Sequence, residues 1–163
     1  MKIATFNVNG INTRLANLLQ WLEREQPDIV CLQALKVQDK DFPSPELEAA
    51  GYGSLHLGQV SWNGVAILAR NSEPLLIHKG LPGEEADTQS RYLEAAAHGV
   101  TRVKITFDPR AIPRHQKPAE AGSLLSNHPS ILSVAIRAMV IIRDLGNASG
   151  QSVDVLLDHT DRW

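Results

Sequence analysis

Cysteine, long apolar runs and an excess of charge are all missing from this sequence. Its 163 residues include one cysteine, Cys31, which excludes an internal disulfide and a cysteine-based metal site. The segment around Arg137 is apolar, but it is shorter than the roughly 20 residues that a membrane-spanning helix needs. No N-terminal apolar run precedes a cleavage site, so we expect a cytoplasmic protein without a membrane partner.

The charge of the chain is close to balanced. The formal net charge is -2, with 43% hydrophobic and 21% charged residues, which is near the average for folded soluble proteins. This composition excludes a disordered chain, and it lacks the global basic excess that drives non-specific binding to nucleic acid. A local basic cleft stays compatible with it. The length suits one domain with a single core.

Short strands and helices alternate in residues 1–100. An apolar segment at 2–8 ends in a turn, leucines recur at helical spacing over 15–22, and 28–33 is a short apolar run, which together predict a strand–helix–strand unit. A capping serine and a following proline at 44–45 predict a second, short helix. Further strands are predicted at 52–57, 64–69, 75–79 and 91–100. This pattern indicates a mixed α/β fold.

The sequence changes character after Val100, so we divide the chain into residues 1–100 and a divergent tail, 101–163, that packs on the same core. The predicted elements of the tail are a strand at 103–107, a linker at 108–122, an apolar helix at 129–145 and a final strand at 153–157. Prolines favour the linker. Polar residues at spacings of three, four and seven favour the helix.

Polar residues follow the first two predicted strands. Asn7 and Asn9 end the first strand, where α/β sheets commonly place their ligands. Amide oxygens can ligate a metal weakly or orient a phosphate, but a simple turn explains the same residues, and this alternative stays open. The second strand is followed by Ala34 and Lys36. A lysine there would face a phosphate, whereas alanine stands where an acidic residue would complete a Mg²⁺ site.

Four sequence blocks resemble the exodeoxyribonuclease III and AP endonuclease branch of the endonuclease/exonuclease/phosphatase superfamily. They are FNVNGI at 6–11, PDIVCLQALK at 27–36, WNGVAI at 62–67 and QSRYLE at 89–94. Their order and number make a chance match improbable. The resemblance implies a partial four-layer αββα sandwich with mostly antiparallel strands, here with an atypical C-terminal strand–helix–strand segment.

The resemblance also implies an activity and a set of site residues. The activity is Mg²⁺- or Mn²⁺-dependent hydrolysis of phosphodiester bonds in duplex or abasic DNA, in DNA repair. Asn7 matches the family's asparagine near the metal and the scissile phosphate, so it is the implied catalytic and metal-contacting residue. Asn9, Lys36 and Arg91 match positions that build the site or contact the substrate.

Several positions depart from the family pattern. Ala34 replaces the metal-binding glutamate, and a methyl group cannot coordinate a cation. Thr106 and Phe107 stand nearest to the expected catalytic tyrosine. The Gly-Asp-x-Asn motif is absent, because no Asp-x-Asn spacing occurs in the chain. The pair Asp158 and His159 is the one partial match to the family's final Ser-Asp-His motif, although a turn at the end of a strand would explain these two residues as well.

These departures predict an exodeoxyribonuclease III-like protein of DNA repair with impaired catalysis. The alternative is a catalytically inactive relative, truncated or recombined, that binds at most DNA or a protein partner. A tail read from a shifted coding segment is a third hypothesis. We also expect self-association if an apolar sheet face is left uncovered.

Overall fold

The structure is a computed structural model that describes residues 1–61, 63–107, 131–134, 138–145 and 154–158. Its strands are β1 (Lys2–Asn7), β2 (Ile29–Gln33), β3 (Tyr52–Leu57), β4 (Val65–Arg70), β5 (Leu75–Lys79), β6 (Tyr92–Ala97), β7 (Val100–Phe107), β8 (Ile131–Val134), β9 (Ala138–Leu145) and β10 (Asp154–Asp158). Its helices are α1 (Leu15–Glu25) and α2 (Ser44–Ala49), with short 3-10 turns at Asn12–Arg14 and Asp39–Asp41. The elements predicted for the first hundred residues are therefore present near their predicted bounds, with one correction: the single strand predicted at 91–100 ends at Ala97, and a turn at 98–99 leads into β7.

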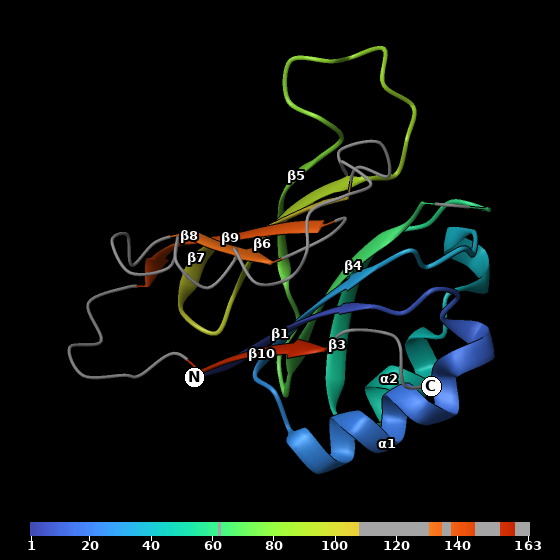
Figure 1. The fold of residues 1–163 in the computed structure, drawn as a ribbon, viewed down its shortest axis with the longest axis vertical. Coiled ribbons are helices and arrows are strands. Elements are labelled where there is room, and N and C mark those ends of the chain that lie inside the picture. Colours follow the sequence, from blue (N-terminus) through green and yellow to red (C-terminus); the bar gives the residue numbers. More distant parts are fainter. Residues whose placement is uncertain (62, 108–130, 135–137, 146–153, 159–163) are drawn as a thin grey trace, which may run out of the picture.

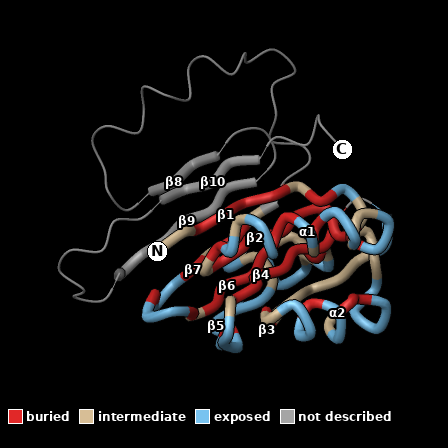
Figure 2. Tube along the Cα trace, turned by 90° about the horizontal axis from the view of Figure 1, so that it is seen from below, coloured by how far each residue is buried: buried red, intermediate tan, exposed pale blue. Residues whose placement is uncertain are grey.

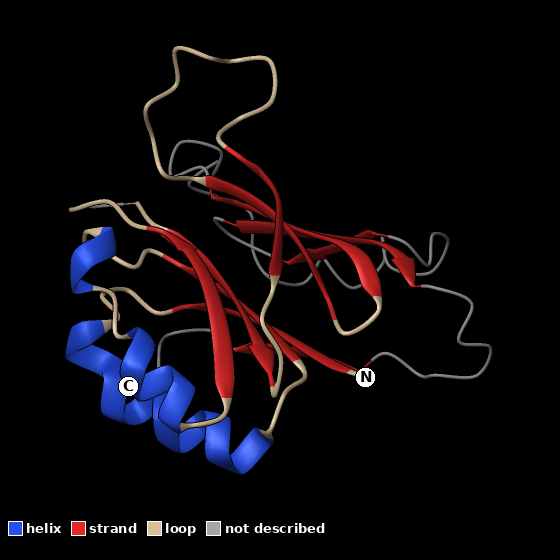
Figure 3. Ribbon diagram, turned by 180° about the vertical axis from the view of Figure 1, so that it is seen from behind, coloured by secondary structure: helices blue, strands red, loops and turns tan. Residues whose placement is uncertain are grey.

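The described strands form two five-stranded sheets. Sheet A has the order β10-β1-β2-β4-β3, and sheet B has the order β5-β6-β7-β9-β8. In sheet A, β1 pairs in parallel with both β10 and β2, and the remaining pairs of the two sheets are antiparallel. The sheets pack face to face, and α1 and α2 cover the outer face of sheet A (Figures 1 and 3). This arrangement confirms the predicted fold class of two mostly antiparallel sheets.

The unit formed by β1, α1 and β2 positions the first two strand ends. Helix α1 buries Leu18, Trp21 and Leu22, whose spacing places them on one helix face. The helix ends where Gln26 adopts a left-handed conformation (φ 46°) and donates its backbone N–H to the carbonyl of Leu22. Because Pro27 cannot continue the helical hydrogen bonding, the chain turns into β2. The crossover makes β1 and β2 parallel, so their carboxyl ends lie at the same edge of sheet A.

Strand β2 is the centre of two cores. All of its residues are buried, as Figure 2 shows for the central strands in general. Successive side chains of a strand point to opposite faces, so Ile29 and Cys31 pack against sheet B, whereas Val30 and Leu32 pack against the helices. A strand buried on both faces reads as a continuous apolar run, which is the pattern that predicted it.

The structure corrects one predicted element of the tail. Residues 131–134 and 138–145, predicted as parts of a helix over 129–145, are strands β8 and β9. These strands pair with each other, and β9 pairs with β7. The run 140–142 in β9 is Val-Ile-Ile, and β-branched residues suit a strand better than a helix. The backbone groups along β7 also need partners, and β9 supplies them.

The rest of the tail joins the same two sheets. Strand β10 occupies 154–158, where a final strand was predicted at 153–157, and it lies beside β1. The linker predicted at 108–122 lies outside the described residues, and the division of the chain at residue 100 stays a prediction. Within the described residues, no helix covers the outer face of sheet B, and none is long and apolar enough to cross a membrane.

Candidate functional site

The candidate site lies at the carboxyl ends of β1 and β2. Beyond the two strands the chains stay side by side, because Val8 N–H donates to Gln33 O (3.0 Å), Gly10 N–H to Ala34 O (2.9 Å) and Ile11 N–H to Leu35 O (3.0 Å). Val8, Ile11 and Leu35 are fully buried, so the two extensions are anchored in the helix-side core. Their polar side chains are therefore presented from a rigid support.

The structure brings three predicted site residues together here. Lys36 Nζ donates to Asn9 Oδ1 at 2.6 Å, and Asn9 N–H donates to Asn7 Oδ1 at 3.2 Å. Asn9 and Lys36 both adopt left-handed backbone conformations, with φ of 48° and 58°, which aim them away from the strand direction. Asn7 thus makes the local turn that the alternative interpretation required, and that turn carries Asn9 to Lys36. We call Asn7, Asn9 and Lys36 the polar corner.

The polar corner does not fit a divalent cation. Mg²⁺ and Mn²⁺ take oxygen ligands, normally with at least one carboxylate. Asn7 and Asn9 offer amide oxygens that already accept hydrogen bonds, and the neighbouring Lys36 is itself a cation. Ala34 is buried at 4% exposure and packs in the core between the sheets. Among the described side chains, no three of His, Cys, Asp and Glu gather as a metal would require.

A third segment lies beside the second. Leu35 N–H donates to Gly64 O (3.2 Å), and Lys36 N–H donates to Asn63 O (3.1 Å). Gly64 makes this approach feasible, since a Cβ there would stand 2.8 Å from Leu35 Cβ, and its φ is +99°. Only glycine combines that backbone conformation with such a close contact.

Arg91 directly precedes β6 of sheet B, on a fourth segment that lies beside the third. Gly64 N–H donates to Ser90 O at 2.9 Å. Arg91 Nε donates to Asp87 Oδ2 at 2.8 Å, and its Nη2 lies 3.7 Å from Glu84 Oε2. The hydrogen bond from Arg91 lowers the pKa of Asp87, and a second bond from Gln89 N–H to that carboxylate acts in the same direction. Arg91 is thus held in one orientation at the entry to β6.

Sequence reasoning missed the side chains that join the third and fourth segments. Gln59 Oε1 accepts hydrogen bonds from Ser90 N–H (2.9 Å) and from Asn63 Nδ2 (2.9 Å). Ser90 Oγ donates to Gly58 O at 2.9 Å. Asn63 and Ser90 belong to two of the blocks that carried the family resemblance, and that was the available signal. Gln59 lies outside those blocks, and nothing in its sequence context marked it.

Buried hydrogen bonds also hold Gln33, the last residue of β2. Gln33 is 2% exposed and donates through Nε2 to Thr5 Oγ1 (2.7 Å) and to Cys31 O (3.0 Å). A buried amide is costly unless it is hydrogen-bonded, so these bonds hold Gln33 in place under the polar corner. The bond between Gln33 and Thr5 links the carboxyl ends of β1 and β2 through side chains, in addition to their backbone pairing.

Asp158 is placed at the same sheet edge by strand register. Strand β10 runs parallel to β1 and pairs Phe6 with Asp158, so Asp158 stands next to the strand that ends in Asn7. Its companion His159 lies outside the described residues. The backbone of Asp158 is therefore near the polar corner in the fold, and the role of the pair Asp158 and His159 stays a prediction.

A second polar cluster lies on the outer face of sheet B. Tyr92 hydroxyl donates to Glu94, Arg102 Nε lies 3.9 Å from Glu94 Oε2, and Lys104 Nζ stands 4.9 Å from the centre of the Tyr92 ring. Burial, and then the bond to Glu94, raise the pKa of Tyr92. The neighbouring Leu93 and Ala95 face the core between the sheets, so this cluster lies on the opposite face of β6 from that core.

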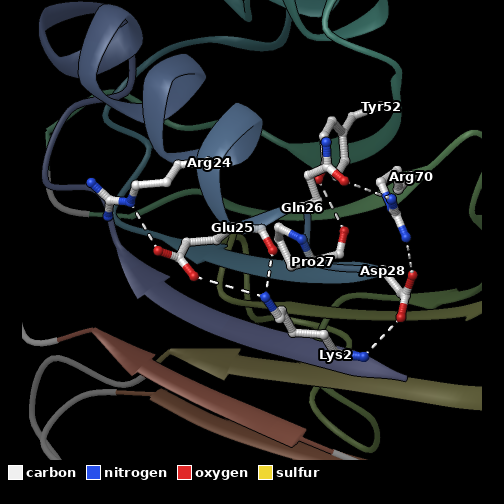
Figure 4. A network of polar contacts seen from close by, with 8 residues as sticks. All are labelled: Lys2, Arg24, Glu25, Gln26, Pro27, Asp28, Tyr52 and Arg70. Atoms are coloured by element: carbon white, nitrogen blue, oxygen red, sulfur yellow. Dashed lines mark hydrogen bonds and ion pairs between the residues drawn. The ribbon is translucent and has the colours of Figure 1, made fainter.

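A larger polar network lies at the opposite end of sheet A (Figure 4). Asp28 accepts hydrogen bonds from Lys2 N–H and Arg70 Nη2, both at 2.7 Å, and Tyr52 hydroxyl donates to Pro27 O at 3.0 Å. Burial raises the pKa of Asp28, but the hydrogen bonds from Arg70 and Lys2 outweigh burial and hold this pKa below its ordinary value. Because the network ties the amino ends of β1 and β2 to β3 and β4, we interpret it as structural.

Comparisons with known proteins point to one family. Residues 4–130 match the Endonuclease/Exonuclease/phosphatase family. Exodeoxyribonuclease III of Haemophilus influenzae is 40% identical over 95 residues, which are 58% of this chain and 35% of that protein. The chain spans about a third of the length of the curated relatives it matches.

Solved structures agree in fold. An AP endonuclease from Archaeoglobus fulgidus is 37% identical, with a TM-score of 0.61, over 66% of this chain and 40% of that chain. A 3′ phosphatase from Neisseria, bound to a product DNA hairpin, is 40% identical with a TM-score of 0.57, over 60% of this chain and 38% of that chain.

Proposed function

Because the chain belongs to the endonuclease/exonuclease/phosphatase family, we propose that it is an exodeoxyribonuclease III-like protein of DNA repair that acts on the backbone of duplex or abasic DNA. The observation that carries the proposal is the polar corner, where Lys36 Nζ meets Asn9 Oδ1 at 2.6 Å beside Asn7. Relatives with 37–40% identity are an exodeoxyribonuclease III and an AP endonuclease, which supports this substrate.

The proposed roles follow from the chemistry of each side chain. Lys36 is a compact positive charge of the kind that attracts a phosphate. Arg91 presents a planar group suited to phosphate oxygens. Asn9 orients Lys36, and Asn7 is the catalytic residue that would donate its amide N–H to the scissile phosphate. Together they would bind and orient the DNA backbone.

The proposal includes impaired catalysis. Family members suggest use of a divalent metal, Mg²⁺ or Mn²⁺, which would stabilise charge on the reacting phosphate. Ala34 supplies no ligand for such an ion, and the polar corner as described does not fit one. Asp158, whose strand lies beside β1, and His159 are weak candidates for a carboxylate and an imidazole that would take part in the reaction. We therefore propose slow turnover at best, with phosphate binding by Lys36 and Arg91 independent of the metal.

The alternative is an inactive relative that acts at most as a DNA- or protein-binding module. The missing carboxylate at position 34 favours it, since phosphodiester hydrolysis needs an activated water as well as phosphate contacts. Under both proposals the protein is cytoplasmic and its single cysteine stays reduced. Cell fractionation tests that location.

The deciding experiment restores the missing ligand. Duplex DNA with one abasic site is incubated with the parent chain and with Ala34→Glu, in Mg²⁺ and in chelator. If the proposal is right, the rate of cleavage in Mg²⁺ is at least about tenfold higher for Ala34→Glu than for the parent. Removal of a group that holds a catalytic metal typically lowers metal affinity or activity by this factor or more.

The control is Ala16→Glu, which adds the same charge at an exposed position of α1. It should leave cleavage unchanged. A folded Ala34→Glu protein that binds the duplex but does not cleave it would overturn the enzyme proposal and support the binding module. If neither the parent nor the folded variant cleaves or binds the duplex, the enzyme proposal and a DNA-binding module are both overturned, and a protein-binding module is the remaining alternative.

A further inference from the structure

The entry to β6 is held by side chains rather than by the sheets alone. The segment from Gly80 to Arg91, between β5 and β6, projects beyond the two sheets (Figures 1 and 3). Half of its residues are exposed, and exposed segments of this kind move unless hydrogen bonds hold them. Arg91 stands at the root of this projecting segment. Its position relative to the polar corner therefore depends on how that root is attached.

Three hydrogen bonds attach Ser90, the residue before Arg91: Gly64 N–H donates to its carbonyl, its Oγ donates to Gly58 O, and its own N–H donates to Gln59 Oε1. The third is the one that joins Ser90 to the side chain of Asn63. Gln59 Oε1 receives Ser90 N–H and Asn63 Nδ2, both at 2.9 Å, which uses both lone pairs of the oxygen. Asn63 in turn accepts Lys36 N–H on its backbone carbonyl at 3.1 Å. The chain of bonds thus runs from the backbone of Lys36 through Asn63 and Gln59 to the residue before Arg91.

We propose that Gln59 and Asn63 are positioning residues, which hold Arg91 at a fixed place relative to Lys36 so that both cations meet the phosphates of one DNA backbone. The inference rests on the proposed function. Gln59 and Asn63 do not touch DNA themselves in this proposal. They act by removing the ordering cost that a mobile Arg91 would add to each binding event.

Asp87 completes the arrangement from the other side. Its Oδ1 accepts Gln89 N–H at 3.2 Å and its Oδ2 accepts Arg91 Nε at 2.8 Å. The carboxylate therefore fixes the rotation of the guanidinium group through Nε, while Nη2 lies 3.7 Å from Glu84 Oε2. In this proposal a phosphate oxygen replaces Glu84 at that terminal nitrogen. Gln59 sets where the Arg91 backbone lies, and Asp87 sets how its side chain points.

The test measures how Gln59 and Arg91 are coupled in DNA binding. Affinity for a labelled duplex with one abasic site is measured by fluorescence anisotropy in chelator, for the parent, Gln59→Leu, Arg91→Ala and the double variant. We expect Gln59→Leu to weaken binding by about 3- to 30-fold, which is the usual range of coupling between contacting residues. In the Arg91→Ala background it should add little further loss.

Gln20→Leu is the matched control, because Gln20 is an exposed glutamine on α1. It should bind as the parent does. Equal losses from Gln59→Leu in both backgrounds would overturn the positioning role, since a general structural defect does not depend on Arg91. An unchanged affinity for Gln59→Leu would also overturn it. A parent chain that binds no duplex, in chelator or in Mg²⁺, would overturn the proposed function and this inference with it.

A second measurement does not depend on DNA. The Ser90 amide should exchange slowly with solvent in the parent and markedly faster in Gln59→Leu, because its acceptor is gone. If Gln59→Leu does not fold, Gln59→Met, which is closer in shape, replaces it in both measurements. An unchanged exchange rate of Ser90 in a folded variant would contradict the attachment on which the inference depends.

Discussion

His56 shows how one side chain can couple the stability of this protein to pH. It stacks on Phe42 with ring centroids 3.9 Å apart and lies 3.9 Å from an oxygen of Asp39. Burial lowers the pKa of His56 below its ordinary value of 6.5, although Asp39 opposes the shift. The folded protein therefore takes up this proton at a lower pH than the unfolded chain does.

This difference predicts a loss of stability on acidification. As the pH falls below about 6.5, the unfolded chain gains a proton that the folded protein does not, so the free energy of unfolding decreases. The decrease ends once the folded His56 is protonated too. In His56→Phe the slope between pH 6.5 and 5 should be smaller, by part of the roughly 1.4 kcal/mol that one proton contributes per pH unit. Urea unfolding at several pH values measures it, and identical slopes in both proteins would refute the assignment.

At the scale of elements, the site depends on chain segments that extend past the ends of strands. The segments at 8–11, 34–36, 63–64 and 90–91 lie side by side through backbone hydrogen bonds. These segments adjoin β1, β2 and β4 of sheet A and β6 of sheet B. Their backbone bonds therefore join the two sheets at one edge. Gly64 packs so closely on Leu35 that an added Cβ would stand 2.8 Å from Leu35 Cβ.

Substitution of Gly64 should therefore disturb the array. Gly64→Ala places a methyl group 2.8 Å from Leu35 Cβ at a φ of +99°, so we expect a loss of about 2–5 kcal/mol from strain and overpacking together. Gly80→Ala is the matched control, since its φ is +83° but nothing lies within 4 Å of the added atom. It should cost about 1 kcal/mol. Thermal or urea unfolding distinguishes the two, and equal losses would contradict the close packing.

At the scale of the whole molecule, sheet A is shared by two cores. Cys31 belongs to the core between the sheets, and burial raises the pKa of its thiol to about 12. Trp21 belongs to the core under the helices, where it stacks on Phe6 at 5.9 Å. Because β2 contributes alternate residues to both cores, loss of one core removes the support of the other.

We therefore expect the two cores to unfold in one cooperative transition. In a protein with Trp62→Phe and Trp163→Phe, fluorescence reports Trp21 alone, while labelling of Cys31 by a thiol reagent reports the core between the sheets. The two probes should give the same urea midpoint. Labelling of Cys31 at clearly lower urea than the change at Trp21 would show that the sheets separate before the helical layer melts.

The family was readable from the sequence because its motifs are local. The blocks at 6–11, 27–36, 62–67 and 89–94 are contiguous residues whose order survives without any structure, and the family match confirms the resemblance. The strands and helices before residue 107 were predictable for the same reason, since hydrophobic spacing of 2 or 3.6 residues is a property of neighbours along the chain. The absence of a ligand at Ala34 was equally visible.

Tertiary structure alone decided the elements that depend on distant partners. The segment 129–145 carries a polar spacing that suits a helix, yet its residues 138–145 form β9 because β7 offers backbone groups that need partners. Gln59 acquires a role only when the fold brings Ser90, 31 residues later, to its side chain. Asp158 reaches the edge of Asn7 only through the pairing of β10 with β1. Local spacing determines which elements the chain can form, whereas hydrogen-bond satisfaction and packing between distant segments determine which it does form and which side chains then meet.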